Sequence, residues 1–200
     1  MTRVAILDRD ATIIDVVRDE ETGTVSVAFH PEQLRFLPGA IEGMRTLQDS
    51  GYVLCIATNQ PGPAKGQFSV EAVRRTNRAL TERLTHEGVR IAAIEVCMHH
   101  PGGGPGGDPL LLQSCECRKP KPGMLNALVQ RLGAVRADSW MIGDSASDIE
   151  AGHAAGLRTG LLFLPNRCEL CPMRSAAAGP VPDARGATLL ELAGIIVRGA

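Results

Sequence analysis

Short apolar runs recur along the chain, and they are typical of strands buried on both faces of a parallel sheet. They predict strands at residues 4–7, 53–57, 91–98, 140–142 and 159–164. Apolar residues at helical spacing predict helices at residues 40–50, 70–87, 124–132, 146–155 and 188–197. Strands that alternate with helices indicate an α/β fold, in which a Rossmann-like parallel sheet carries helices on both faces.

Polar, glycine-rich and proline-rich stretches separate these elements. Residues 15–33 predict a loop or small hairpin over the sheet edge, and residues 59–69 predict a loop. Residues 99–114 are so rich in Gly and Pro that no regular structure is expected there. The Pro-, Ala- and Arg-rich stretch 166–187 predicts an irregular tail. The length of 200 residues fits one domain, so we expect a single domain over residues 1–200.

Composition and charge narrow the class of protein. A net charge of -1 gives no electrostatic footprint for nucleic acid or an anionic membrane, and an aromatic content of 3% disfavours base stacking. No apolar run reaches membrane-spanning length, and the N-terminus lacks a signal-peptide layout. We therefore expect a cytoplasmic protein with neither nucleic-acid nor membrane partners.

Carboxylates follow two of the predicted strands, where sites form in parallel sheets. Asp8 and Asp10 follow the first strand, whereas Asp144 and Asp148 follow the strand at 140–142. One carboxylate can attack phosphorus, and another can move the proton of the leaving group. Carboxylates also suit magnesium, although each pair could instead cap a helix or lie in a solvated loop. Arg9, between the first two, is expected to point outward or line the entrance.

Further polar residues complete a phosphate-binding set. Thr58 and Asn59 offer a hydroxyl and an amide to phosphate oxygens, although both are also ordinary strand-end residues. Arg118 and Lys119 lie in a segment stiffened by two prolines. A lysine aimed at a transferring phosphoryl group would stabilise its charge, whereas the alternative is a solvated basic turn.

Two close Cys/His pairs predict a zinc site. Cys97 and His99 form Cys-x-His, and Cys115 and Cys117 form Cys-x-Cys. Three thiolates and one imidazole suit tetrahedral zinc without an open position, which is a structural site. Buried free cysteines or a disulfide are alternatives, and His100 could replace His99 as the ligand.

A third cysteine pair lies in the tail. Cys168 and Cys171 form Cys-x-x-Cys without a visible second half. We interpret them as two incidental thiols, and a second metal clip is the alternative.

Together and in this order, the motifs resemble those of the haloacid dehalogenase superfamily of phosphatases. The four motifs correspond to Asp8-Arg9-Asp10-Ala11-Thr12, Thr58, Lys119, and Gly143-Asp144 with Asp148. The resemblance implies Asp8 as the nucleophile and Asp10 as the general acid and base. It implies magnesium held by Asp8, the backbone carbonyl of Asp10, and Asp144. It also implies that Asp148 orients the site or Lys119.

The zinc cluster, residues 118–124 and residues 58–66 resemble the D-glycero-D-manno-heptose 1,7-bisphosphate phosphatases and the similar histidinol-phosphate phosphatase domains. That resemblance implies a capless monomer in which the zinc loop at 97–117 replaces a cap domain. It implies hydrolysis of a small sugar phosphate, with the heptose bisphosphate as first candidate. Histidinol phosphate, another specialised metabolite, or an inactive zinc-clipped binding module are the alternatives. The expected substrate-binding residues are Thr58, Asn59, Gln60, Lys65 and Arg118.

Overall fold

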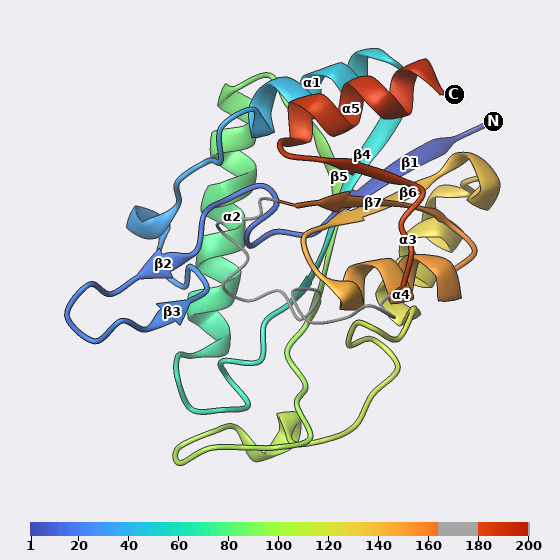
Figure 1. Cartoon of the computed structure of the whole chain (residues 1–200). Coiled ribbons are helices and arrows are strands. Elements are labelled where there is room, and N and C mark those ends of the chain that lie inside the picture. Colours follow the sequence, from blue (N-terminus) through green and yellow to red (C-terminus); the bar gives the residue numbers. More distant parts are fainter. Residues whose placement is uncertain (164–179, 200) are drawn as a thin grey trace.

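The computed structural model describes residues 1–163 and 180–199, in which strands and helices alternate as the hydrophobic pattern predicts (Figure 1). The main strands are β1 (Arg3–Leu7), β4 (Tyr52–Asn59), β5 (Ile91–Cys97), β6 (Trp140–Gly143), β7 (Arg158–Leu162) and β8 (Ala184–Gly186). The helices are α1 (Ala40–Asp49), α2 (Val70–His86), α3 (Gly123–Leu132), α4 (Ala146–Ala154) and α5 (Leu189–Arg198), with short 3-10 turns η1 (Pro31–Gln33), η2 (Pro109–Leu111) and η3 (Arg136–Asp138).

The six strands form one sheet in the order β5-β4-β1-β6-β7-β8, and all neighbouring pairs are parallel. Along the chain this order is third, second, first, fourth, fifth, sixth, which is the doubly wound arrangement. The order reverses between β1 and β6, and ligand sites of such sheets form beyond the carboxyl ends of the strands at this switch point. The predicted Rossmann-like α/β fold is therefore confirmed, and its switch point lies where Asp8 and Asp144 follow their strands.

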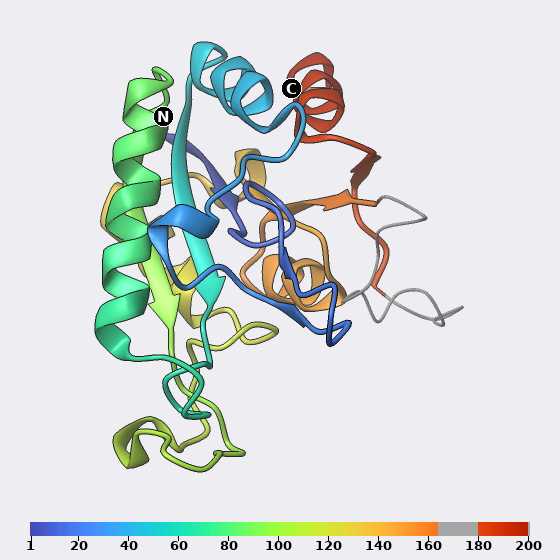
Figure 2. The same ribbon diagram turned by 90° about the vertical axis from the view of Figure 1, so that its left-hand side faces the viewer.

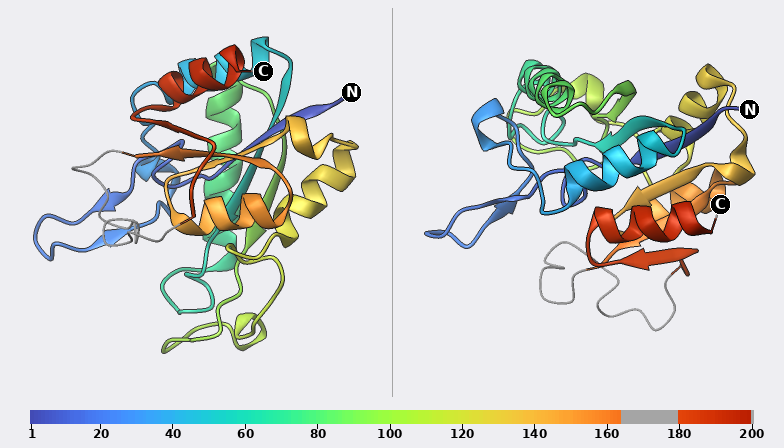
Figure 3. Two further views of the ribbon diagram at one scale, coloured as in Figure 1. Left: turned by 45° about the vertical axis from the view of Figure 1, so that its right-hand side comes forward. Right: turned by 90° about the horizontal axis from the view of Figure 1, so that it is seen from above.

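Two hydrophobic cores lie on opposite faces of the sheet, because successive strand residues point to opposite sides. In β1, Ala5 and Leu7 belong to the core shared with α1, α2 and α5. Val4 and Ile6 belong to the other core, shared with α3 and α4. Helices thus cover both faces, and α1 and α5 lie side by side (Figure 3).

The segment at 15–33 contains a small antiparallel hairpin of β2 (Val17–Arg18) and β3 (Val25–Ser26), as predicted. The loop at 99–114 is not wholly irregular, because the turn η2 forms within it. The Asp108 side chain caps this turn by accepting a hydrogen bond from the backbone N–H of Leu110 at 3.0 Å.

The prediction of an irregular tail at 166–187 is wrong at residues 184–186, which form β8 beside β7. This strand has three residues with an exposed arginine at its centre, so it carries no apolar run that could reveal it. Cys168 and Cys171 lie outside the described residues. No helix in the described part of the chain has the length and hydropathy to span a membrane.

The loops after β4 and β5 pack against each other beyond the strand ends (Figure 2). The backbone N–H of Asp108 donates to the carbonyl oxygen of Pro63 at 3.0 Å. A Cβ atom at Gly107 would lie only 2.1 Å from the carbonyl oxygen of Ala64, so the close approach requires glycine. The glycine-rich composition of the zinc loop therefore allows it to pack backbone to backbone beside the site.

Candidate active site

One buried ammonium group joins the ends of several elements. Lys119 Nζ lies 2.8 Å from Asp8 Oδ1 and 2.6 Å from Asp148 Oδ1. It also donates to the carbonyl oxygen of Ala57 in β4 at 2.8 Å. The Lys119 residue is only 4% exposed, so its charge is stabilised by these three acceptors and not by water.

Asn59 holds the backbone of Lys119 from the end of β4. The Lys119 N–H donates to Asn59 Oδ1 at 3.1 Å, and Asn59 Nδ2 donates to the Lys119 carbonyl oxygen at 3.0 Å. These bonds use the amide oxygen and one of the amide N–H groups. Asn59 therefore positions Lys119, and its expected contact with substrate stays a prediction.

Three carboxylates gather next to this ammonium. Asp8, Asp144 and Asp148 each offer an oxygen, and these atoms lie within 4.8 Å of one another. When all three carboxylates are ionised, the single ammonium among them leaves an excess of two negative charges. A hard divalent cation with oxygen ligands matches both the charge and the donor atoms, so the residues fit magnesium.

Both carboxylate oxygens of Asp148 contact protein groups. Besides the contact with Lys119, its Oδ2 accepts from the Ser145 backbone N–H at 3.1 Å and from Ser145 Oγ at 2.6 Å. This is a capping box at the start of α4. Asp148 thus orients Lys119 while it caps a helix, so the two interpretations of its position hold together.

Burial and the repulsion of neighbouring negative charges raise the pKa values of Asp8 and Asp144. Burial raises the pKa of Asp8 from 3.8 to about 6, against the opposing effect of the Lys119 charge. Burial and the charges of Asp148 and Asp8 raise the pKa of Asp144 to about 8. Burial would lower the pKa of Lys119, yet the two carboxylates raise it above its ordinary value. The site therefore disfavours the ionised forms of Asp8 and Asp144, and a bound cation would stabilise them.

Arg9 does not point outward, and this expectation is wrong. The residue is 0% exposed, and its Nε and Nη2 atoms each lie 3.0 Å from an oxygen of Asp10. Its Nη1 donates to Asn77 Oδ1 in α2, and its Nη2 also donates to the carbonyl oxygen of Ala28, both at 2.7 Å. A buried guanidinium needs such partners because its charge has lost water.

Gln60 connects Asp10 to Thr58. Its Nε2 lies 2.6 Å from Asp10 Oδ2 and 2.9 Å from Thr58 Oγ1. Both Gln60 and Thr58 are buried. The structure thus brings Gln60 to the acid and base candidate, and its expected contact with substrate stays a prediction.

The two basic residues expected to bind substrate lie apart from these networks. Arg118 Nη1 is buried and has no hydrogen-bond partner among the described residues, which leaves a donor for a ligand. Lys65 is partly exposed in the loop after β4. Their contacts with phosphate stay predictions, as does the Asp10 carbonyl as a magnesium ligand.

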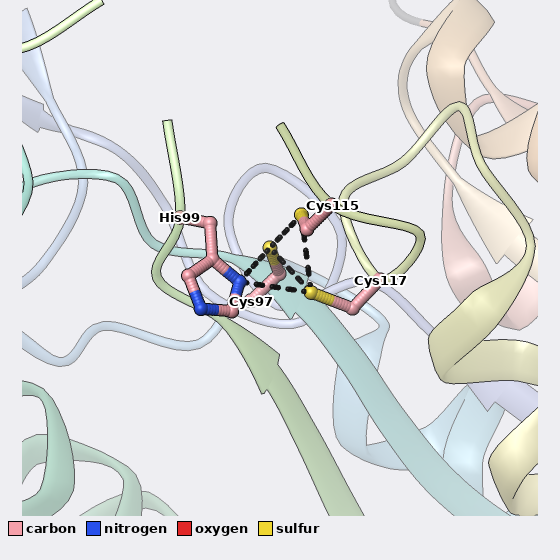
Figure 4. A group of neighbouring side chains, drawn as sticks. All are labelled: Cys97, His99, Cys115 and Cys117. Carbon is pink, nitrogen blue, oxygen red and sulfur yellow. Dashed lines mark hydrogen bonds between the residues drawn. The ribbon is translucent and has the colours of Figure 1, made fainter. Parts of the chain in front are cut away.

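The cysteine and histidine side chains form one compact cluster (Figure 4). The three sulfur atoms lie 3.0, 3.3 and 3.6 Å apart, and His99 Nδ1 lies 3.2 Å from Cys117 Sγ and 3.9 Å from Cys97 Sγ. Thiolates around tetrahedral zinc lie about 3.8 Å apart, given Zn–S bonds of about 2.3 Å. The three sulfur atoms lie closer together than this, and the fit to zinc rests on the donor set, three thiols and one imidazole whose ligand atoms lie within 4.8 Å of one another. His100 Nδ1 instead lies against the backbone N–H and carbonyl oxygen of Gly102, so His99 is the ligand candidate.

This cluster connects β5 to the segment that carries the ammonium. Cys97 ends β5, and Cys117 lies two residues before Lys119. The backbone N–H of Gly123, at the start of α3, donates to the carbonyl oxygen of Glu116 at 2.9 Å. Lys119 thus lies between the cysteine and histidine cluster on one side and helix α3 on the other.

The doubly wound sheet, the strand-end carboxylates and the buried lysine define a phosphatase of the haloacid dehalogenase (HAD) class. A family model described as HAD-hydrolase-like matches residues 116–163. A D-glycero-beta-D-manno-heptose-1,7-bisphosphate 7-phosphatase from Rhodopseudomonas palustris is 39% identical over 76% of this chain and 79% of its own length. The enzyme of that name from Pasteurella multocida is 34% identical over 81% of this chain and 82% of its own length.

A solved structure agrees with these relatives. The D,D-heptose 1,7-bisphosphate phosphatase from B. bronchiseptica, complexed with magnesium and phosphate, superposes with a TM-score of 0.79 at 25% identity, and the match covers 100% of both chains. The present chain belongs to the family of D-glycero-beta-D-manno-heptose-1,7-bisphosphate 7-phosphatases. It is a phosphatase, which excludes the inactive binding module, and HAD phosphatases use magnesium.

Replacing Cys115 by serine removes one of the four metal ligands. We expect zinc, measured by inductively coupled plasma mass spectrometry, to fall well below that of the unsubstituted protein, with a loss of activity because Lys119 is no longer held. Cys55→Ser is the matched control, since Cys55 is a buried free thiol of β4 outside the cluster. Equal zinc in Cys115→Ser and in the control would contradict the assignment.

Without magnesium, stability is expected to fall as the pH rises. The folded-state pKa values of Asp8 (about 6) and Asp144 (about 8) exceed the ordinary 3.8. Bound protons therefore favour the folded form fully below about pH 4, and this contribution is lost as the pH rises to about 8. The urea concentration at the unfolding midpoint of zinc-loaded, magnesium-free protein should decline over this pH window. The decline should be less steep in Asp144→Asn. Added magnesium should restore the stability of the unsubstituted protein at pH 8. If the urea midpoints of the two proteins fall equally with pH, Asp144 is not the source of the pH dependence.

Proposed function

We propose that this chain removes the 7-phosphate of D-glycero-beta-D-manno-heptose 1,7-bisphosphate through an aspartyl-phosphate intermediate on Asp8. The observation that carries the proposal is the Lys119 ammonium, which contacts Asp8 and Asp148 beside Asp144. The substrate and its anomer are inferred from the relatives, which share the sugar in their names.

The first half-reaction transfers the phosphoryl group to the protein. An oxygen of Asp8 attacks phosphorus, and the bond from phosphorus to the ester oxygen breaks with its electron pair on that oxygen. Protonated Asp10 gives its proton to the same oxygen, so the sugar leaves as a neutral alcohol. Lys119 stays close to the reacting centre because its ammonium lies 2.8 Å from the attacking carboxylate.

The second half-reaction releases phosphate. The Asp10 carboxylate takes a proton from water, whose oxygen attacks phosphorus. The bond from phosphorus to Asp8 then breaks, which restores the Asp8 carboxylate and frees inorganic phosphate. Asp10 gives up its proton in the first half-reaction and regains one from water in the second. The protein therefore returns to its starting state.

Magnesium, when bound, would screen the negative charge between the phosphoryl group and the carboxylates. Asp8, Asp144 and the Asp10 carbonyl would hold it, since Asp148 already contacts Lys119 and Ser145. Zinc at the cysteine cluster would act through geometry alone, because its four protein ligands leave no open position.

We infer a single domain over residues 1–200 that acts as a cytoplasmic monomer on a small phosphorylated sugar. The two hydrophobic cores on one continuous sheet support the single domain.

Purified protein with magnesium should release phosphate from the heptose bisphosphate with a higher kcat/KM than from histidinol phosphate. Asp8→Asn should reduce turnover to the background level, because the amide cannot act as the nucleophile. Asp49→Asn removes an equivalent charge from the exposed end of α1 and should keep full activity. The proposal fails if no sugar phosphate is hydrolysed, or if Asp8→Asn turns over like the control.

A further inference from the structure

The carboxylate of Asp10 is almost fully occupied by protein donors. Its Oδ2 accepts from Arg9 Nε at 3.0 Å and from Gln60 Nε2 at 2.6 Å. Its Oδ1 accepts from Arg9 Nη2 at 3.0 Å. A carboxylate has about four lone-pair sites, two on each oxygen. Oδ2 is therefore saturated, and Oδ1 keeps one site for a further partner.

Arg9 is itself held from two distant parts of the chain. Its guanidinium makes two bonds to Asp10, one to Asn77 in α2, and one to the carbonyl oxygen of Ala28, shortly after β3. These bonds fix the plane of a group that presents its donors in a rigid fork. Because the residue is 0% exposed, Arg9 cannot meet a substrate phosphate directly.

We propose that Arg9 is a positioning residue that aims Oδ1 of Asp10 at the leaving oxygen of the substrate. The bidentate contact fixes the rotation of the carboxylate, and the free site on Oδ1 carries the proton that moves to that oxygen. The anchors at Ala28 and Asn77 tie this orientation to the correct seating of the segment after the hairpin against α2. The inference rests on the proposed function only in taking Asp10 as the proton donor.

The dependence of rate on the leaving group separates this role from a structural one. An alkyl ester such as the 7-phosphate needs a proton on its leaving oxygen, whereas p-nitrophenolate leaves without one. Arg9→Met should lower kcat on the heptose bisphosphate by on the order of 10²-fold, since general acid catalysis contributes that much or more. On p-nitrophenyl phosphate the same variant should lose only a small factor.

Four further variants calibrate the result. Asp10→Asn should show the same contrast between the two substrates, and adding Arg9→Met to it should cause little further loss on the heptose bisphosphate. Asn77→Ala removes one anchor but leaves the arginine, so it should show the same contrast more weakly. Arg83→Met is the matched control, because Arg83 also joins α2 to the preceding segment, through the Leu34 carbonyl oxygen, without touching Asp10. It should change both rates alike or not at all.

Thermal unfolding and hydrogen exchange over residues 15–33 would be measured on each variant. If Arg9→Met does not fold, Arg9→Lys and Asn77→Ala carry the test, since an ammonium cannot bridge both oxygens as the planar fork does. Equal losses on both substrates in these variants would overturn the inference, as would full activity on the heptose bisphosphate. A native protein that hydrolyses neither substrate would instead refute the proposed function, and the positioning role with it.

Discussion

The buried ammonium of Lys119 is the interaction on which the site depends. It has almost no contact with solvent, so its charge is tolerated only while Asp8, Asp148 and the Ala57 carbonyl oxygen surround it. Asp8 follows β1, Asp148 lies in the first turn of α4, and Ala57 lies in β4. The strand order of the sheet brings these three parts of the chain together around Lys119. The same carboxylates repel one another, and their excess negative charge makes the site suited to a divalent cation.

Lys119 lies outside every strand and helix, so interactions other than regular secondary structure must fix its position. The Asn59 side chain bonds both the backbone N–H and the carbonyl oxygen of Lys119, and the cysteine cluster ends two residues earlier at Cys117. The proposed zinc thus replaces hydrophobic burial in a loop that has little of it, because Gly and Pro dominate residues 99–114. Zinc, when bound, would fix the course of the backbone that leads to Lys119, whereas magnesium would compensate the charge of the neighbouring carboxylates.

Local patterns predict much of this architecture, and long-range partners account for what they miss. Apolar runs and helical spacing locate the main strands and helices except β8, and carboxylates at strand ends locate Asp8 and Asp144. The sequence does not predict the buried position of Arg9, because arginine is normally exposed. The groups that hold its guanidinium, at Ala28 and Asn77, lie 19 and 68 residues away. Gln60 and Asn59 are similar cases, since their partners are known only once the fold brings β1 and the segment of Lys119 beside β4.

Phosphorylation of Asp8 beside Lys119 is the step from which the rest of the proposed mechanism follows. The phosphorylated protein can be trapped if enzyme is mixed with heptose bisphosphate labelled in the 7-phosphate and quenched rapidly in acid. Borohydride reduction and peptide mass spectrometry then locate the modified residue. The mechanism predicts that label appears on the protein within the first turnover and that reduction converts Asp8 alone to homoserine. A first turnover that releases phosphate with no labelled protein, or conversion at another residue, would contradict it.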